Sequence, residues 1–409
     1  MRMFRSGIRG FGAAAAVLVA CAALTGCGSD ASGTATAAEI DVRKLEVGPY
    51  STVPLDLRYT YPYRATAARH LAAVRLADQL ATGHEIDDRL MYGTGSTPIT
   101  GQADVMDVLA DVNGPVAERN GLMFGYGAGA ADVQTTDATP QRANNTFTTL
   151  TVMQFPSDEA ASRAAREFDE TDFAVAPDQN QPVALPAYPA AHSHWRPTVS
   201  TIGSTMAHGK YVINLYAGLP AADISSLTVL VEKAYSTQIP LLDALPPLSL
   251  EEMLRLPADP DGMLNRTLNP DGFGTPDAKN QITYGLRGFL HQLADQEVWR
   301  KRSADTGLDR VSLTREPSGS TSTVFRTRDS ASAATLRSVI LEKTFPSPAD
   351  APAGVPDSVC GEDKSASYKT KRFRCAVNYR RYVAAVEGDQ LQDVHQRAAA
   401  EYALLANNQ

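Results

Sequence analysis

Two histidines separated by one residue are the first candidates for chemistry in this 409-residue chain, in the stretch His192-Ser193-His194-Trp195. On a β-strand, His192 and His194 would face the same side and offer two ligands to one metal ion. A closed zinc site takes about four ligands, and no further Cys or His lies nearby in the sequence. The alternative is an ordinary strand that packs Trp195 beneath a polar face. We therefore predict no metal site and no catalytic residue here.

Two acidic turns suggest calcium at first sight. They are Asp259-Pro260-Asp261-Gly262 and Asn269-Pro270-Asp271-Gly272. Proline at the second position, and Met263-Leu264 after the first turn, break the alternating ligand pattern of an EF-hand. Tight turns account for these residues fully. The chain also lacks the Gly-x-Ser-x-Gly elbow of serine hydrolases and the glycine loops of nucleotide-binding proteins, so we expect no cofactor.

A basic cluster lies near the C-terminus of a chain whose net charge is -8. Its members of interest are Lys369, Lys371, Arg372, Arg374, Arg380 and Arg381. Such a cluster could bind anionic lipid headgroups or an acidic cell-wall polymer. The alternative is a solvated hairpin in which alternate residues point outward. The acidic charge of the whole chain argues against nucleic acid as a partner.

The N-terminus has the features of a bacterial export signal. Three arginines precede an apolar run over residues 11–24, and Leu24-Thr25-Gly26-Cys27 follows. The apolar run is too short to span a bilayer as a stable helix, which is typical of a signal peptide. The motif resembles the lipoprotein signal in which the cysteine receives acyl chains. We therefore predict a signal peptide over 1–26, lipidation of Cys27, a flexible tether over 27–39 and a protein anchored on the extracytoplasmic face of the cell membrane.

The remaining cysteines follow from this location. Cys21 leaves with the signal peptide, which leaves Cys360 and Cys375 as a pair in an oxidising compartment. We predict that they form a disulfide rather than a metal or redox site. In the chain-entropy model, a disulfide that closes a loop of this length stabilises the fold by about 3 kcal/mol.

The mature chain contains an internal repeat. Strand-like and helix-capping residues around Asp158 recur around Asp329, and Lys210-Tyr211-Val212 recurs as Arg381-Tyr382-Val383, both at an offset of 171 residues. Pro246-Pro247 would break any helix between the copies and marks the boundary. We predict two domains, residues 40–245 and 246–409.

Each copy is expected to be an α+β domain. Helical segments come first, the clearest being 64–81, and a small, mainly antiparallel sheet follows. One helix follows a central strand and another closes each copy, over 221–238 and 390–405. We expect helices to cover one face of each sheet. At the offset of 171, the first copy has Pro189 and Ser204 in place of the two cysteines.

The chain also resembles the uncharacterised actinobacterial two-domain lipoproteins of the DUF7373 type. The residues that carry the resemblance are Leu24-Thr25-Gly26-Cys27, Gly48-Pro49-Tyr50, Phe173-Ala174-Val175, the stretch from Leu185 to His192, and Leu241-Leu242-Asp243. The resemblance implies a location and a two-domain architecture. It implies no catalytic residues, because the family has no assigned reaction.

The sequence therefore predicts a non-catalytic binding protein of the cell envelope. Its partner would be an envelope lipid, a polymer or another protein, and we expect it to bind between the two halves. The alternatives are an unrecognised cell-wall hydrolase or transferase, and a structural assembly protein.

Overall fold

The structure is a computed structural model that describes residues 39–55, 64–134, 145–270, 277–367 and 370–408. Cys27, the predicted signal peptide and nearly all of the tether lie outside these residues. Residues from Asp41 onward belong to one structural unit. Among the described helices, none is long and apolar enough to cross a membrane.

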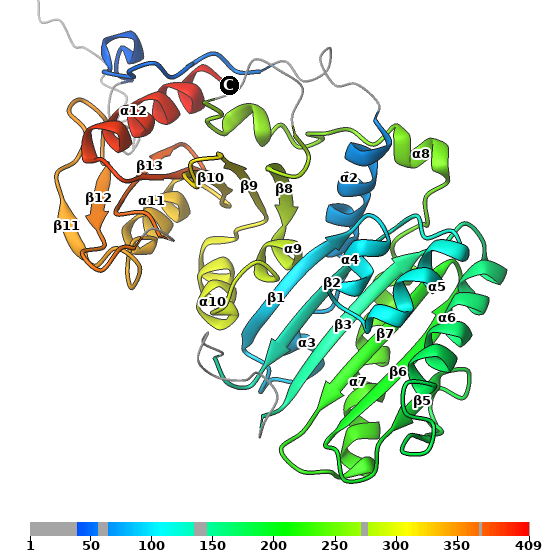
Figure 1. The fold of residues 1–409 in the computed structure, drawn as a ribbon. Helices are drawn as coiled ribbons and strands as arrows, with labels where there is room; N and C mark the ends of the chain where they lie inside the picture. The colour runs from blue at the N-terminus through cyan, green and yellow to red at the C-terminus, as the bar shows by residue number, and fades with distance from the viewer. Residues whose placement is uncertain (1–38, 56–63, 135–144, 271–276, 368–369, 409) are drawn as a thin grey trace, which may run out of the picture. The chain divides into compact units, whose positions relative to one another are not determined.

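The first half is built on a seven-stranded sheet ordered β1-β2-β3-β7-β6-β5-β4 (Figure 1). Every neighbouring pair is antiparallel. The strands are β1 (Tyr92–Ile99), β2 (Phe124–Ala131), β3 (Phe147–Gln154), β4 (Gln181–Pro182), β5 (His192–Trp195), β6 (Thr201–His208) and β7 (Tyr211–Gly218). The helices are α2 (Ala65–Ala77), α3 (Gly83–Ile86), α4 (Gln102–Met106), η2 (Asp111–Asn113), α5 (Gly114–Arg119), α6 (Asp158–Phe173), α7 (Ile224–Asp243) and α8 (Leu250–Leu254).

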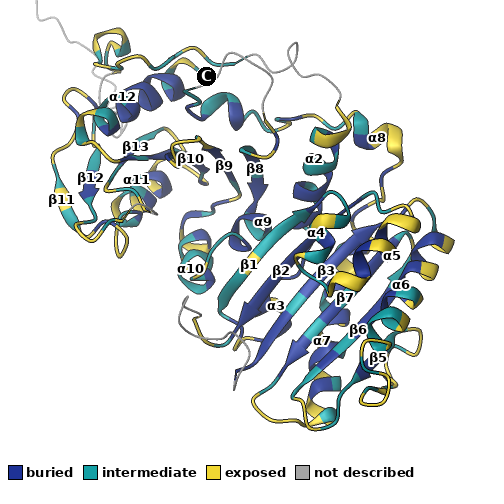
Figure 2. Ribbon diagram, in the orientation of Figure 1, coloured by how far each residue is buried: buried dark blue, intermediate teal, exposed yellow. Residues whose placement is uncertain are grey.

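Helices cover both faces of this sheet, which differs from the expected single covered face. On β7, Val212 packs with the apolar side of α6, whereas the next residue, Ile213, joins the core made with α2 and α7. Successive residues of a strand point to opposite faces, so these helices lie on opposite sides. Strand β2 is buried at every position as a result (Figure 2). Its glycine- and alanine-rich sequence gave no apolar run from which two-sided burial could be inferred.

The second half repeats the topology of the first. Its sheet order, β8-β9-β10-β14-β13-β12-β11, matches the first sheet strand for strand, and every neighbouring pair is antiparallel. The strands are β8 (Gln281–Gly285), β9 (Arg310–Arg315), β10 (Thr321–Arg326), β11 (Ser347–Ala349), β12 (Val359–Glu362), β13 (Phe373–Tyr379) and β14 (Tyr382–Gly388). The helices are η3 (Leu264–Arg266), α9 (Leu286–Leu290), α10 (Gln296–Thr306), α11 (Ser330–Val339) and α12 (Leu391–Asn407). The α+β class and the tandem architecture are thus confirmed.

Helix capping marks the same place in both halves. The Ser157 side chain accepts a hydrogen bond from the backbone of Ala160 at the start of α6, and Asp329 accepts one from Ser332 at the start of α11. Such caps satisfy amide groups that the first helical turn leaves without partners. Each capped helix follows the third strand of its sheet, so the recurring residues around Asp158 and Asp329 do mark equivalent elements.

The disulfide has a structural counterpart in the first half. Cys360 on β12 lies directly opposite Cys375 on β13 and is bonded to it. At the same place in the first sheet, Ser193 on β5 lies opposite Ser204 on β6, with their hydroxyl oxygens 2.7 Å apart. Ser204 is therefore the counterpart of Cys375, as the offset predicted. The counterpart of Cys360 is Ser193 rather than Pro189, because the hairpin loop between β5 and β6 is shorter than the one between β12 and β13.

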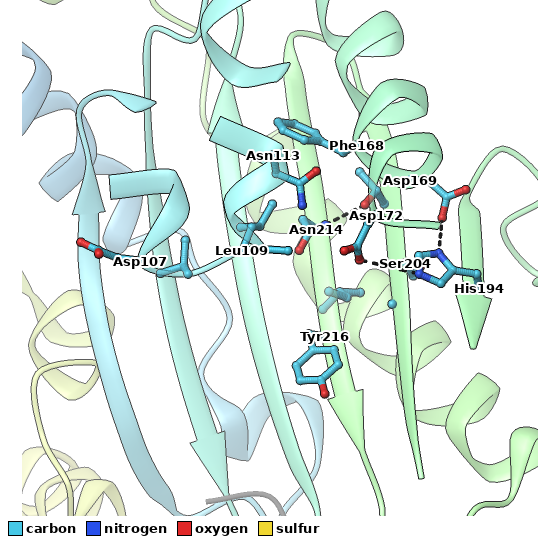
Figure 3. Close-up of a pocket in the computed structure, with 15 residues that line it drawn as sticks. Asp107, Leu109, Asn113, Phe168, Asp169, Asp172, His194, Ser204, Asn214 and Tyr216 are labelled. Atoms are coloured by element: carbon cyan, nitrogen blue, oxygen red, sulfur yellow. Dashed lines mark hydrogen bonds and ion pairs between the residues drawn. The ribbon is translucent and has the colours of Figure 1, made fainter. Parts of the chain in front are cut away.

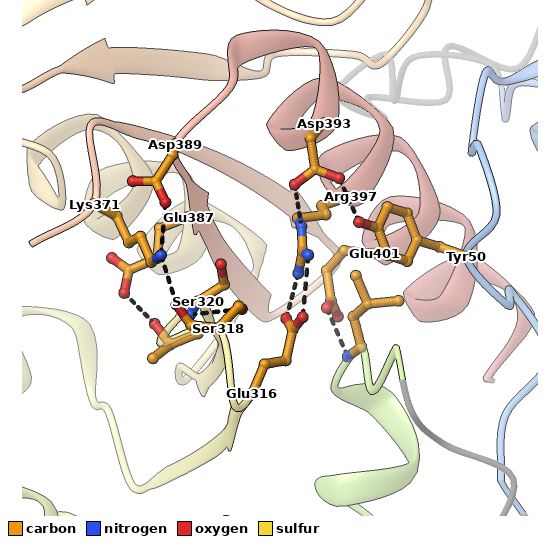
Figure 4. Close-up of polar contacts among 12 residues, drawn as sticks. Tyr50, Glu316, Ser318, Ser320, Lys371, Glu387, Asp389, Asp393, Arg397 and Glu401 are labelled. Atoms are coloured by element: carbon orange, nitrogen blue, oxygen red, sulfur yellow. Dashed lines mark hydrogen bonds and ion pairs between the residues drawn. The ribbon is translucent and has the colours of Figure 1, made fainter. Parts of the chain in front are cut away.

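A segment near the N-terminus, residues 42–52, packs on the second half; we call it the strap. It includes η1 (Val42–Lys44) and lies along α12. The Tyr50 hydroxyl donates to the Asp393 carboxylate, and Arg397 stacks its guanidinium 4.8 Å from the centre of the Tyr50 ring (Figure 4). The Asn407 amide donates to the carbonyl of Thr52 at 2.8 Å. The predicted first domain, 40–245, thus begins with a segment whose contacts are made with the second half.

Candidate functional site

A cavity of about 340 Å³ opens on the α6 face of the first sheet. Strands β5, β6 and β7 form its floor, and the end of α6 and the segment from Asp107 to Asn113 form its walls (Figure 3). Its polar side chains are those of Asp107, Asn113, Asp169, Asp172, His194, Thr205, Asn214 and Tyr216. Its volume lies within the range of small-molecule sites, about 300–1,000 Å³.

Helix α6 supplies two carboxylates to the cavity. Its core-facing stripe passes through Ala161, Ala165 and Phe168, all buried. Asp172 continues this stripe four residues after Phe168, where helical spacing would place an apolar residue. Asp169 lies three residues before Asp172, so the two carboxylates project from neighbouring positions on the helix surface.

His194 lies between these carboxylates. Its Nδ1 atom is 2.7 Å from Oδ1 of Asp169, and its Nε2 atom is 3.7 Å from Oδ2 of Asp172. The Phe173 ring contacts the imidazole edge to face, with 5.5 Å between ring centres. Gly203 lies opposite His194 on β6, where a Cβ atom would contact the imidazole at 3.7 Å. Carboxylates beside both ring nitrogens hold the imidazole in one orientation.

The floor of the cavity is polar because strand residues with amide and hydroxyl side chains face it. Asn214 donates from Nδ2 to the hydroxyl of Thr205 at 2.7 Å. Across the cavity, Asn113 is 3% exposed. Among the described residues its Oδ1 atom has no hydrogen-bond partner. A buried acceptor without a partner costs free energy, so a donor from a bound molecule would be stabilised here.

The lining of the cavity is acidic. Burial raises the pKa of the Asp172 carboxyl, and the charge of His194 opposes that rise. Asp107 adds a third carboxylate to the lining, and the lining residues include no Lys or Arg. The cavity therefore suits a ligand with positive charge and hydrogen-bond donors.

No serine nucleophile stands beside His194 among the lining residues. The Ser204 hydroxyl is bonded to Ser193 and, at 2.8 Å, to the Tyr235 hydroxyl on α7. Helix α7 lies on the opposite face of the sheet, so this hydroxyl is directed away from the imidazole. The arrangement thus favours binding over acyl transfer through Ser204.

The predicted histidine pair separates into two roles. His194 lines the cavity, while His192, at the start of β5, is not among the lining residues. Trp195 packs against the apolar core, as the ordinary interpretation of this strand holds. The missed partners were Asp169 and Asp172. The signal that could have found Asp172 is a carboxylate in an otherwise apolar helical stripe.

The basic cluster is largely paired with acidic side chains. Lys371 lies 2.7 Å from Asp389 (Figure 4). Arg372 lies 2.6 Å from Glu362, and Arg374 lies 2.6 Å from Glu387. The guanidinium groups of Arg380 and Arg381 lie over the rings of Tyr379 and Tyr382. Lys369 lies outside the described residues. Binding to an anionic surface stays a prediction.

The other predicted sites are structural where they are described. Both oxygens of Asp259 accept backbone hydrogen bonds, from Met263 and Asn265, as a tight turn requires. The second acidic turn lies partly outside the described residues. His395 lies close to the Cys360–Cys375 disulfide. Among the described residues, these three side chains are of metal-binding types and lie close enough together to share an ion. With both sulfurs bonded to each other, the group offers no thiolate to a metal.

Comparison with known proteins identifies the family. Residues 59–258 match the domain of unknown function DUF7373, N-terminal, and residues 263–408 match its C-terminal domain. Among solved structures, the extracellular domain of PknH from Mycobacterium tuberculosis is similar over 47% of this chain and 100% of that one, with 9% identity and a TM-score of 0.31. No curated protein matches the chain. Because the two matches together span most of the sequence, the chain belongs to the DUF7373 family and carries both its N-terminal and its C-terminal domain of unknown function.

Proposed function

We propose that this protein is a lipid-anchored binding protein on the extracytoplasmic face of the membrane, and that its first half holds a small, positively charged, hydroxyl-rich ligand. An amino sugar unit of an envelope glycan has this chemistry. The observation that carries the proposal is the acidic cavity, with Asp107, Asp169 and Asp172 in its lining and no Lys or Arg. The lipidation motif that ends at Cys27 and the Cys360–Cys375 disulfide support the location.

Different lining residues would contact the ammonium group and the hydroxyl groups of the ligand. An ammonium group beside Asp169 and Asp172 would form charge-assisted hydrogen bonds, which are stronger than neutral ones. Sugar hydroxyls would donate to Asn113, whose Oδ1 atom has no partner among the described residues. His194 is held by both carboxylates, so we assign it a positioning role.

The test is titration calorimetry on the exported protein lacking its acyl chains, with glucosamine and glucose as probes. Glucosamine should bind, and glucose should bind at least ten-fold more weakly, because a charge-assisted hydrogen bond contributes about 1.5–3 kcal/mol. Asp172→Asn should remove this preference.

The matched control is Asp243→Asn. Asp243 lies 2.7 Å from His208, in a second Asp–His pair whose residues do not line the cavity. This variant should bind glucosamine like the wild type. Equal affinity for glucose and glucosamine, or equal losses in both variants, would contradict the proposal.

A glycan-cleaving activity is the second candidate, because Asp172 has a raised pKa and faces the cavity. A general acid requires a carboxyl group that keeps its proton near neutral pH. Turnover of cell-wall glycans that Asp172→Asn abolishes would establish an enzyme. Binding without turnover would leave the binding function.

A further inference from the structure

A second cavity, also of about 340 Å³, lies between α2 and the edge strand β8. Helix α2 lines it with Leu71, Val74, Arg75 and Asp78, which recur at helical spacing on one face. The connection 256–261 closes another side, and residues of β8 face the helix. None of these residues belongs to the lining of the acidic cavity, so the two cavities are separate sites.

The walls of the second cavity are mainly apolar. Val74 and Ile282 are 6% and 7% exposed, and Ala258 is 7% exposed. Leu71 and Leu256 add aliphatic side chains to the lining. A cavity of this volume with aliphatic walls suits an alkyl chain, since burial of each CH₂ group contributes about 0.8 kcal/mol.

Most charges at this cavity have fixed partners. Asp78 accepts from the backbone amides of Gly285 and Gly288, at 2.8 and 3.0 Å. Arg310 lies 2.7 Å from Asp261. Arg310 and Asp261 thus neutralise each other, whereas Asp78 is bonded to neutral amides and burial raises the pKa of its carboxyl.

Arg75 is the exception. Its Nη2 atom donates to the carbonyl of Pro246 at 3.3 Å. Its Nη1 atom is buried and has no hydrogen-bond partner among the described residues. The hydroxyl of Thr283, another lining residue, is likewise buried without a partner in the described chain. A guanidinium with an unused donor at an apolar cavity favours an anionic acceptor.

We infer that this cavity binds one long-chain carboxylate, with the alkyl chain along α2 and β8 and the carboxylate on Arg75. One carboxylate oxygen would accept from Nη1 of Arg75, and the Thr283 hydroxyl is a further donor in the lining. The ligand is an amphiphile, whereas the acidic cavity excludes anions. The inference does not depend on the proposed amino sugar site.

The experiment is titration calorimetry of the exported protein with dodecanoate and with dodecanol, which has the same chain without the charge. Dodecanoate should bind at one site per protein and more tightly than dodecanol. Arg75→Gln should weaken dodecanoate by ten- to a hundred-fold and leave dodecanol unchanged. Arg255→Gln is the matched control, because Arg255 is exposed, pairs with Glu251 and does not line this cavity.

A second variant tests the cavity itself. Ala258→Phe adds a ring to the wall and should abolish binding of both ligands, with thermal unfolding of each variant showing that it folds. Absence of saturable dodecanoate binding in the wild type would overturn the inference. So would dodecanoate binding that Ala258→Phe removes but Arg75→Gln leaves intact, since the site would then hold alkyl chains without recognising a carboxylate.

Discussion

Glu401 on α12 should make the stability of the protein fall as the pH rises, and Glu401→Gln should remove much of that fall. The side chain is 0% exposed. One carboxyl oxygen accepts from the backbone of Leu268 at 2.8 Å (Figure 4). The other has no partner among the described residues. Burial raises the pKa of Glu401 from 4.5 to about 8. At neutral pH the folded protein therefore keeps a proton that the unfolded chain releases.

The sign and size follow from linkage. An acid with a raised pKa in the folded state contributes stability at pH values below its unfolded pKa, and this contribution is lost as the pH rises towards 8. At about 1.4 kcal/mol for each factor of ten, the rise from 4.5 to about 8 corresponds to a loss of roughly 5 kcal/mol. Glutamine carries no titrating proton, so the variant should escape this loss.

Urea unfolding followed by tryptophan fluorescence measures the effect, with both proteins compared between pH 5 and pH 8. The difference between the free energies of unfolding of Glu401→Gln and the wild type should change in favour of the variant by about 1.4 kcal/mol for each rise of one pH unit, over most of this range. Parallel pH dependences for the two proteins would refute the reasoning, because they would mean that Glu401 keeps an ordinary pKa in the folded state.

Two further predictions concern the second half. Replacing Cys360 and Cys375 together by serine should reproduce the hydroxyl pair of the first half and keep the fold. The free energy of unfolding, measured under oxidising conditions against the wild type, should fall by about 3 kcal/mol. An unchanged stability would count against a structural role for the disulfide. Arg397→Ala should cost about 3–5 kcal/mol, because Arg397 and Glu316 are 8% and 10% exposed and the change leaves a buried carboxylate without its partner; a loss below 1 kcal/mol in urea unfolding would show that water compensates the carboxylate.

Local sequence signals predicted the architecture well. Caps at Ser157 and Asp329, followed by helical spacing, placed two equivalent helices, and the offset of 171 predicted the shared topology. These signals depend only on residues that are close together in the sequence, so the sequence alone is enough to find them. Helix α7 differed in length: it continues through Pro240 to Asp243. Proline removes one backbone N–H from the helix, but its own carbonyl still accepts from the backbone of Ala244, so the last turn is closed.

The candidate site could be predicted only in part. His194 was singled out by its spacing from His192, but its partners, Asp169 and Asp172, come from a helix more than twenty residues away. Which side chains meet across a helix and a sheet depends on the packing of both, and a single sequence does not state it. The same holds for Arg75, whose unused donor becomes visible only when α2 and β8 lie together.

The strap has a consequence for the order in which an exported chain matures. Tyr50 and Asp393 are 343 residues apart in sequence, and Thr52 and Asn407 are 355 apart. During export from the N-terminus the strap would emerge well before the helix that receives it. Contacts of such long sequence separation form late in folding. A chain interrupted before α12 would leave the strap undocked, so the contact between Tyr50 and Asp393 would mark a molecule that has been delivered at least through α12.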